Sequence, residues 1–209
     1  MAKLPLTTEQ RDALDEQQRN SALGGLARCI AQKGYAATTV GEVTAAGRIS
    51  KSTFYAHFAD KEEAFLALFT LTTDNVLRVI EQTAQETTGK HWRERLEKVI
   101  DSYLGALAAD PELARCLLVE TQAVSARAFD LRRQAIDRYV DLFMRLAEDV
   151  TRGDDGLRPL TPELALAVLA GIDELMLRQI GSDGAASLRE VTPAATRLAT
   201  SIVSAEPDR

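Results

Sequence analysis

Helix-capping signals recur along the whole chain and constrain its fold more than any other feature. A Thr or Asp residue is followed three residues later by Glu or Gln, or directly by proline, which are patterns that begin helices. These patterns start at Thr7, Thr39, Asp60, Asp110, Thr161 and Thr192. Apolar residues between the caps recur at three- and four-residue steps, the spacing of one helix face. No segment shows convincing strand alternation, so we predict an all-α protein.

The capping and stop signals predict nine helices. We expect them at Thr7 to Gly34, Thr39 to Ala46, Lys51 to His57, Asp60 to Thr88, Trp92 to Ala109, a short segment after Asp110, Ala123 to Arg152, Thr161 to Gly181, and Thr192 to Ser204. Gly-rich segments at 153–156 and 181–184 are predicted loops.

Composition and charge narrow the class of protein. No run of about 18 apolar residues is present, so we expect no membrane segment. The two cysteines, Cys29 and Cys116, lie in helical patterns and are expected to be reduced core thiols of a cytoplasmic protein. Residues 1–61 contain 8 Lys/Arg and 6 Asp/Glu, whereas the rest contains 17 and 25. This asymmetry suits a protein that approaches an anion with its N-terminal end.

The segment from Gly34 to Phe65 has the features of a DNA-binding motif. Two short predicted helices are separated by the turn 47–49, and the second begins with hydroxyl and amino side chains. A helix N-terminus offers free amides to phosphate, and side chains there reach base edges in the major groove. Phe54 and Phe58 are spaced to pack inward.

This segment resembles the TetR family of bacterial regulators. Residues 34–40 read GYAATTV, residues 49–58 read ISKSTFYAHF and residues 60–62 read DKE. The resemblance implies a TetR-like architecture. A three-helix helix-turn-helix domain at 1–60 is then joined by a shared fourth helix to a ligand-binding and dimerisation domain at 61–209.

The resemblance assigns roles to individual residues. Tyr55 and Lys61 are expected to contact phosphate, and residues 51–53 to face bases. The expected DNA-binding residues are Thr38, Thr39, Arg48, Ser50, Lys51, Ser52, Thr53, Tyr55, His57 and Lys61. The alternatives are a surface role for Tyr55, helix capping for the two threonines, and a helix-end hydrogen bond for His57.

The turn departs from the family pattern, which usually reads Ala-Gly before the Ile/Val-Ser pair. Here Gly47 precedes Arg48, so Arg occupies a place that often needs a positive φ. Either Arg48 adopts the left-handed conformation at a cost on the order of 1 kcal/mol, or the turn is rearranged around Gly47.

For the larger half, the resemblance implies an effector pocket among helices four to eight. The expected lining residues are Phe69, Tyr103, Leu104, Leu117, Glu120, Phe129, Tyr139, Phe143, Met144, Asp173 and Met176. The alternative is that the apolar ones are ordinary core and the acidic ones are solvated. A mostly apolar pocket would suit a small hydrophobic effector.

The last two predicted helices are expected to form a homodimer. Residues 164–177 are apolar on more than one face, and Leu198, Ile202 and Val203 add another stripe. A helix with several apolar faces needs several partners, and a second subunit supplies one.

These features predict a transcription regulator, a repressor that leaves a near-palindromic operator when a small molecule binds. An enzyme is disfavoured, because the chain has two histidines and lacks CxxC, HExxH and glycine-rich phosphate motifs. We expect no cofactor and no metal. The remaining alternative is a helical interaction module that has lost DNA binding, for which the shifted glycine is the only support.

Overall fold

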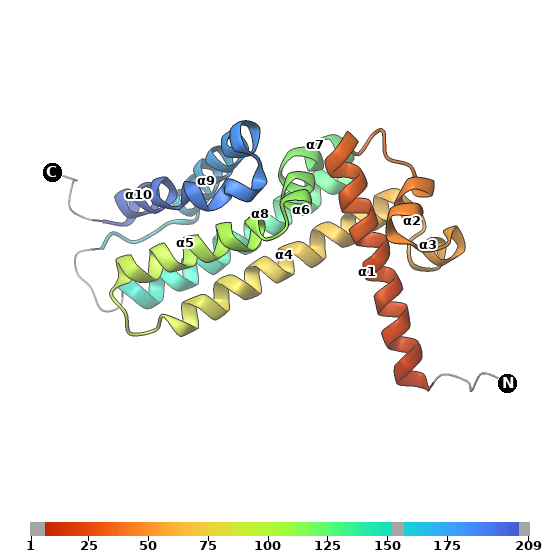
Figure 1. Cartoon of the computed structure of the whole chain (residues 1–209). Helices are drawn as coiled ribbons and strands as arrows, with labels where there is room; N and C mark the ends of the chain where they lie inside the picture. Colours follow the sequence, from red (N-terminus) through yellow and green to blue (C-terminus); the bar gives the residue numbers. More distant parts are fainter. Residues whose placement is uncertain (1–6, 152–156, 205–209) are drawn as a thin grey trace.

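A computed structural model describes residues 7–151 and 157–204, and within these ranges there is no β-strand. The first three helices, α1 (Thr8–Lys33), α2 (Val40–Gly47) and α3 (Lys51–His57), lie at one end of the molecule (Figure 1). Helix α4 (Lys61–Glu86) runs from this end along the larger part of the chain. The predicted loop at 153–156 lies outside the described residues.

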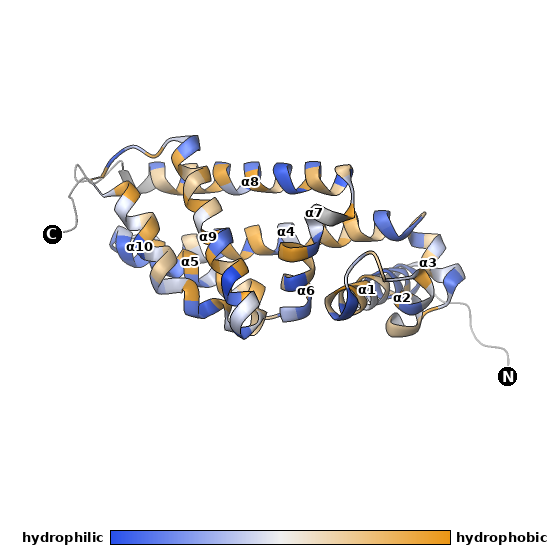
Figure 2. Cartoon of the chain, turned by 90° about the horizontal axis from the view of Figure 1, so that it is seen from above, coloured by the Kyte–Doolittle hydropathy of each residue, from blue (hydrophilic) through white to orange (hydrophobic). Residues whose placement is uncertain are grey.

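The larger part is a stack of helices that covers α4. It contains α5 (Trp92–Ala108), α6 (Pro111–Arg115), α7 (Thr121–Val124), α8 (Ala126–Thr151), α9 (Pro162–Asp183) and α10 (Thr192–Val203). A π-helical turn at Cys116–Glu120 joins α6 to α7, and a 3₁₀ segment at Ala185–Val191 precedes α10. Apolar and polar stretches alternate along α4, α5 and α8, as expected for helices that bury one face (Figure 2). The predicted all-α architecture is confirmed.

The predicted capping residues begin the helices for the expected physical reason. Thr7 accepts a hydrogen bond from the Gln10 amide at 3.2 Å, and the Gln10 side chain accepts one from the Thr7 amide at 3.0 Å. Gly34 ends α1 with φ of 81°, a conformation that glycine adopts without steric cost. Local sequence therefore fixes where α1 begins and ends.

Two predicted boundaries were wrong. The long helix predicted from Ala123 is interrupted at Ser125, whose backbone is extended and whose hydroxyl accepts a hydrogen bond from the Ala128 amide at 3.1 Å. This serine is the N-cap of α8. Helix α9 passes Gly181 and stops at Gly184, which has φ of 83°. Gly181 therefore lies within α9, and Gly184 ends the helix.

Helix α4 contributes to two separate hydrophobic clusters. Its first half packs Phe65, Leu68 and Phe69 against α1, α3 and the π-helical turn. Its second half packs Val76 and Ile80 against α5, α9 and α10. Fully burying a side chain of this size contributes about 1.5–3 kcal/mol. Movement of α4 in one cluster therefore disturbs the other.

Candidate nucleic-acid interface and ligand cavity

The turn between α2 and α3 is built on close packing against α1. A Cβ atom on Gly47 would lie 2.5 Å from the Ser21 carbonyl oxygen, so only glycine fits there. Arg48 follows with φ of 54° and ψ of 39°, which is the left-handed conformation. The first of the two expected alternatives for this turn is therefore confirmed. Arg28 of α1 donates to the Ala46 carbonyl at 2.7 Å and holds the end of α2.

Helix α3 presents a polar face and buries an apolar one. Phe54 is fully buried, and its ring lies 5.6 Å from that of Phe58. Lys51 and Ser52 are exposed on the opposite face, and Tyr55 is 55% exposed. This division leaves Lys51, Ser52 and Tyr55, three of the residues predicted to meet DNA, accessible at the molecular surface.

A cluster of hydroxyl groups shapes the N-terminus of α3. Ser50 caps the helix by accepting a hydrogen bond from the Thr53 amide at 3.0 Å. Its Oγ also lies 2.7 Å from Ser52 Oγ and 2.8 Å from Thr53 Oγ1. If Ser52 or Thr53 contacts DNA, its hydroxyl exchanges the hydrogen bond with Ser50 for one with DNA. Lys51 forms no described hydrogen bond or ion pair, so it has none to break when it contacts DNA.

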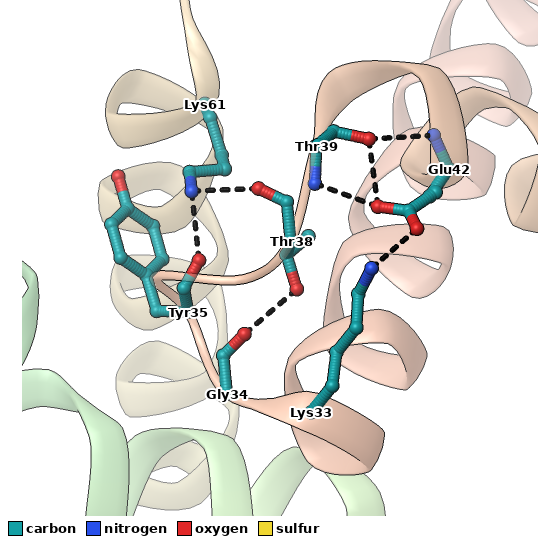
Figure 3. Close-up of polar contacts among 7 residues, drawn as sticks. All are labelled: Lys33, Gly34, Tyr35, Thr38, Thr39, Glu42 and Lys61. Carbon is teal, nitrogen blue, oxygen red and sulfur yellow. Dashed lines mark hydrogen bonds and ion pairs between the residues drawn. The ribbon is translucent and has the colours of Figure 1, made fainter.

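The two threonines before α2 have different environments. Thr38 is 2% exposed, and its hydroxyl donates to the Gly34 carbonyl at 2.9 Å, so it is an internal structural residue. Thr39 is exposed and caps α2 together with Glu42, as Figure 3 shows. The Glu42 carboxylate also forms an ion pair with Lys33. Its hydrogen bonds with Lys33 and Thr39 lower the pKa of Glu42 to about 2.

Lys61 holds the loop between α1 and α2. Its ammonium donates to the Tyr35 and Thr38 carbonyls, each at 2.7 Å, and lies 4.0 Å from the centre of the Tyr35 ring (Figure 3). Partial burial and the nearby Lys33 lower the pKa of Lys61. An ammonium has three N–H donors, so one remains for a phosphate oxygen. The predicted phosphate contact stays a prediction.

His57 points toward α1 rather than outward with Tyr55. Its side chain is 7% exposed, and Nε2 lies 3.7 Å from the Asp15 carboxylate of α1. This placement disfavours a phosphate contact, but the observed contact is with α1 and is not the helix-end hydrogen bond expected as the alternative.

The larger part of the protein reaches the first three helices through Glu120. This residue, predicted to line the effector pocket, instead accepts a hydrogen bond from the Tyr35 amide at 2.9 Å. The Tyr35 peptide is therefore held on its N–H side by the π-helical turn and on its carbonyl side by Lys61. A second link joins α4 to α8, where Ser125 donates to Glu62 at 2.9 Å.

A cavity of about 230 Å³ lies between α4, α5, the π-helical turn, α8 and α9. Five of the predicted pocket residues line it: Phe69, Tyr103, Leu117, Tyr139 and Asp173. Sequence reasoning missed Arg132, which lines the cavity and forms an ion pair with Asp173 at 2.6 Å. The signal that could have identified Arg132 is its position, as a charged residue, on the otherwise apolar face of α8.

The other predicted pocket residues do not line this cavity. Leu104 and Met176 are fully buried in the core that α5 and α9 share, and Met144 packs beside Val140. Phe129 is 49% exposed on α8. Phe143 lines a second, smaller cavity of about 90 Å³ at the end of the molecule remote from α3. The helical spacing of these apolar residues predicts that they are buried, but it does not show which of them face the cavity.

Two other kinds of site are absent from the described residues. No group of three His, Cys, Asp or Glu side chains there is placed to hold a metal ion. Within those same ranges, no helix is both long enough and apolar enough to cross a membrane.

Comparison with known proteins agrees with this geometry. Residues 23–68 match the family model described as "Bacterial regulatory proteins, tetR family". The chain is 24% identical over 131 residues to the HTH-type transcriptional activator FasR of Mycolicibacterium smegmatis; the match covers 56% of this chain and 59% of that protein.

Solved structures share the fold over most of the chain. A TetR family transcription regulator from Marinobacter aquaeolei matches 95% of this chain and 100% of its own, with a TM-score of 0.69 and 22% identity. The fatty acid degradation regulator FadR from Bacillus halodurans matches 87% and 93%, with a TM-score of 0.78 and 19% identity. FadR from Bacillus subtilis, solved with stearoyl-CoA, matches 92% and 99%, with a TM-score of 0.68 and 17% identity.

Proposed function

Because residues 23–68 match the model of the TetR family and the chain shares the fold of TetR-family regulators, we propose that this protein is a cytoplasmic regulator that releases operator DNA when an effector binds. The observation that carries the proposal is the polar face of α3. Lys51 and Tyr55 are accessible on it, while Phe54 anchors its other face in the core. A role without catalysis agrees with the family.

The protein is proposed to bind DNA as a dimer formed by α9 and α10. Two copies of α3 would then enter successive major grooves about 34–36 Å apart. Leu164 of α9 is 40% exposed on a different face from Leu166, which lines the 230 Å³ cavity, and this supports an apolar contact available to a second copy. The operator should accordingly consist of two related half-sites. The dimer bound at its operator would repress transcription, although the similar FasR is named an activator.

We propose that effector occupancy is communicated through the π-helical turn. Leu117 and Leu118 of this turn line the 230 Å³ cavity, and Glu120 at its end holds the Tyr35 amide. A ligand that displaces the two leucines would weaken the bond to Tyr35 and loosen the loop before α2. The ligand must bind the DNA-incompetent state more tightly, since only differential affinity shifts the equilibrium.

The DNA-binding proposal is tested with fluorescence anisotropy on a fragment from upstream of the protein's own gene. Binding should weaken steeply as salt is raised, because phosphate contacts release counterions. Lys51→Ala should change the preferred base at one position in each half-site, whereas a Lys98→Ala control on the exposed face of α5 should not. Binding that is equally weak to every sequence, and unchanged by Lys51→Ala, would contradict the proposal.

The coupling proposal is tested by hydrogen exchange at the amides of residues 35–38. Glu120→Ala should speed exchange at Tyr35, because its amide loses its acceptor. Glu120→Gln retains a side-chain oxygen and should change exchange less. If both variants exchange as the parent does, Glu120 does not hold this loop in solution.

A further inference from the structure

The 230 Å³ cavity is lined by two phenols whose hydroxyls are not satisfied by any group in residues 7–151 and 157–204. Tyr103 and Tyr139 both line it, and their ring centres lie 5.7 Å apart. Tyr103 is 6% exposed, yet within the described part of the chain neither hydroxyl has a hydrogen-bond partner. Thr196 Oγ1 is the fully enclosed polar side-chain atom without a partner in that part of the chain. The two phenol oxygens are therefore not sealed in protein, and they open onto the cavity.

The charged side chains that line the cavity already form ion pairs within the protein. Arg132 and Asp173 pair at 2.6 Å, with side chains 21% and 22% exposed. Glu174, at the cavity edge, pairs with Arg178 at 2.8 Å. A ligand carboxylate drawn to Arg132 would lie beside Asp173, and a ligand ammonium drawn to Asp173 would lie beside Arg132. A buried charge of either sign thus meets a like charge and also loses its hydration.

Apart from Thr72 and Thr73, the remaining lining is apolar, and it sets the size of the ligand. Phe69, Val76, Leu107, Leu117 and Leu169 supply most of the wall around the phenols. The cavity of about 230 Å³ exceeds the engineered cavity of about 150 Å³ that binds benzene in another protein.

We infer that the effector places an uncharged hydrogen-bonding group, such as a hydroxyl, ester or thioester, against the hydroxyls of Tyr103 and Tyr139, with an aliphatic segment in the rest of the cavity. This inference rests on the proposed function and names its ligand class. Burial raises the pKa of both phenols above the ordinary value, so at neutral pH both are protonated donors. Each phenol can donate to a ligand oxygen and can accept from a ligand hydroxyl. A free fatty acid or an alkyl amine lacks an uncharged head and is disfavoured.

Isothermal titration calorimetry with three eight-carbon probes tests the ligand class on the full chain. At pH 7, 1-octanol should bind at least about tenfold more tightly than octanoate or octylammonium, because only it avoids burying a charge. Tyr103→Phe and Tyr139→Phe should each weaken 1-octanol about fivefold, the effect of one net hydrogen bond. Toluene, which cannot form such a bond, should bind the parent and both variants equally and so report that the cavity is intact.

Several results would overturn the inference. These are octanoate or octylammonium binding as tightly as 1-octanol, no binding of any probe, or phenylalanine variants that bind 1-octanol as the parent does. DNA binding in the absence of probe is measured separately on the same samples. Loss of operator binding would refute the proposed function, whereas operator binding with the wrong probe preference would refute only the ligand class.

Discussion

Two adjacent residues in the α2–α3 turn have different backbone requirements. Gly47 is helical, and its missing side chain lets α2 approach the Ser21 carbonyl of α1. Arg48 carries the positive φ that ends α2, although it has a Cβ atom. The glycine thus serves packing, and the arginine bears the conformational strain. A strained residue retained beside the polar face of α3 is consistent with a role for its guanidinium at the DNA.

The substitution Arg48→Gly should raise the free energy of unfolding by about 1 kcal/mol, because glycine adopts the left-handed conformation without the steric cost. Gly47→Ala is the matched control and should lower the free energy of unfolding by about 2 kcal/mol, since a methyl group there clashes with the backbone of α1. Urea unfolding of both variants measures these changes. If Arg48 also contacts phosphate, the more stable variant should bind DNA more weakly.

Lys61 has two possible roles that a salt titration separates. Lys61→Ala removes the bonds to the Tyr35 and Thr38 carbonyls and should weaken operator binding. If the ammonium also contacts a phosphate, the slope of log affinity against log salt should fall by about one. Weaker binding with an unchanged slope would show that Lys61 only positions the loop.

At the scale of elements, the loop between α1 and α2 is where the two parts of the molecule meet. Helix α4 supplies Lys61, the π-helical turn supplies Glu120, and α1 supplies Lys33, which pairs with the Glu42 cap of α2. Three elements from different parts of the sequence therefore set the start of α2, and α2 in turn positions α3. The position of α3 therefore depends on contacts made outside α3 as well as on its own residues.

The cap of α2 should make this region sensitive to acid. The folded pKa of Glu42 is about 2, below the ordinary value of 4.5, so its contribution to stability is complete above pH 4.5 and is lost as the pH falls toward 2. The protection factors of the α2 amides, which are their exchange rates corrected for the intrinsic effect of pH, should fall over this range in the parent. Glu42→Gln should already have lower protection factors at neutral pH, and these should fall less in acid. Identical pH profiles for the two proteins would argue against the cap.

At the scale of the whole molecule, charge and exposed apolar surface are separated. The helix-turn-helix end carries the positive excess, whereas exposed Leu164 and Leu166 lie on α9 in the larger part. A dimer through α9 and α10 would leave both α3 helices free for DNA. In this arrangement, the affinity for DNA would depend on dimer formation.

Ala167→Arg should disrupt the proposed dimer, because it adds bulk and charge to the exposed face of α9 without touching the 230 Å³ cavity. Light scattering after size exclusion should show a monomer, and operator affinity should fall at least about tenfold once the two half-sites are no longer bound together. Glu97→Arg on α5 is the matched control and should remain dimeric. A dimeric Ala167→Arg protein would place the interface elsewhere.

The sequence by itself determined most of the helices, their order and the polar face of α3, but not the break at Ser125 or the end of α9. Capping pairs such as Thr39 and Glu42 act within four residues, and the apolar spacing of Phe54 and Phe58 follows helical geometry. These signals are local, so they can be read without knowing the fold. The similarity to TetR proteins resides in the same local segment.

Only the tertiary structure decided which residues face the cavity and how the two parts communicate. Glu120 and Tyr35 are far apart in the sequence, and their hydrogen bond exists because α1 packs against the π-helical turn. Leu104 and Tyr103 are neighbours in an apolar pattern, yet only Tyr103 meets the cavity. Helical periodicity tells that a face is buried, whereas the packing of several helices determines what that face encounters.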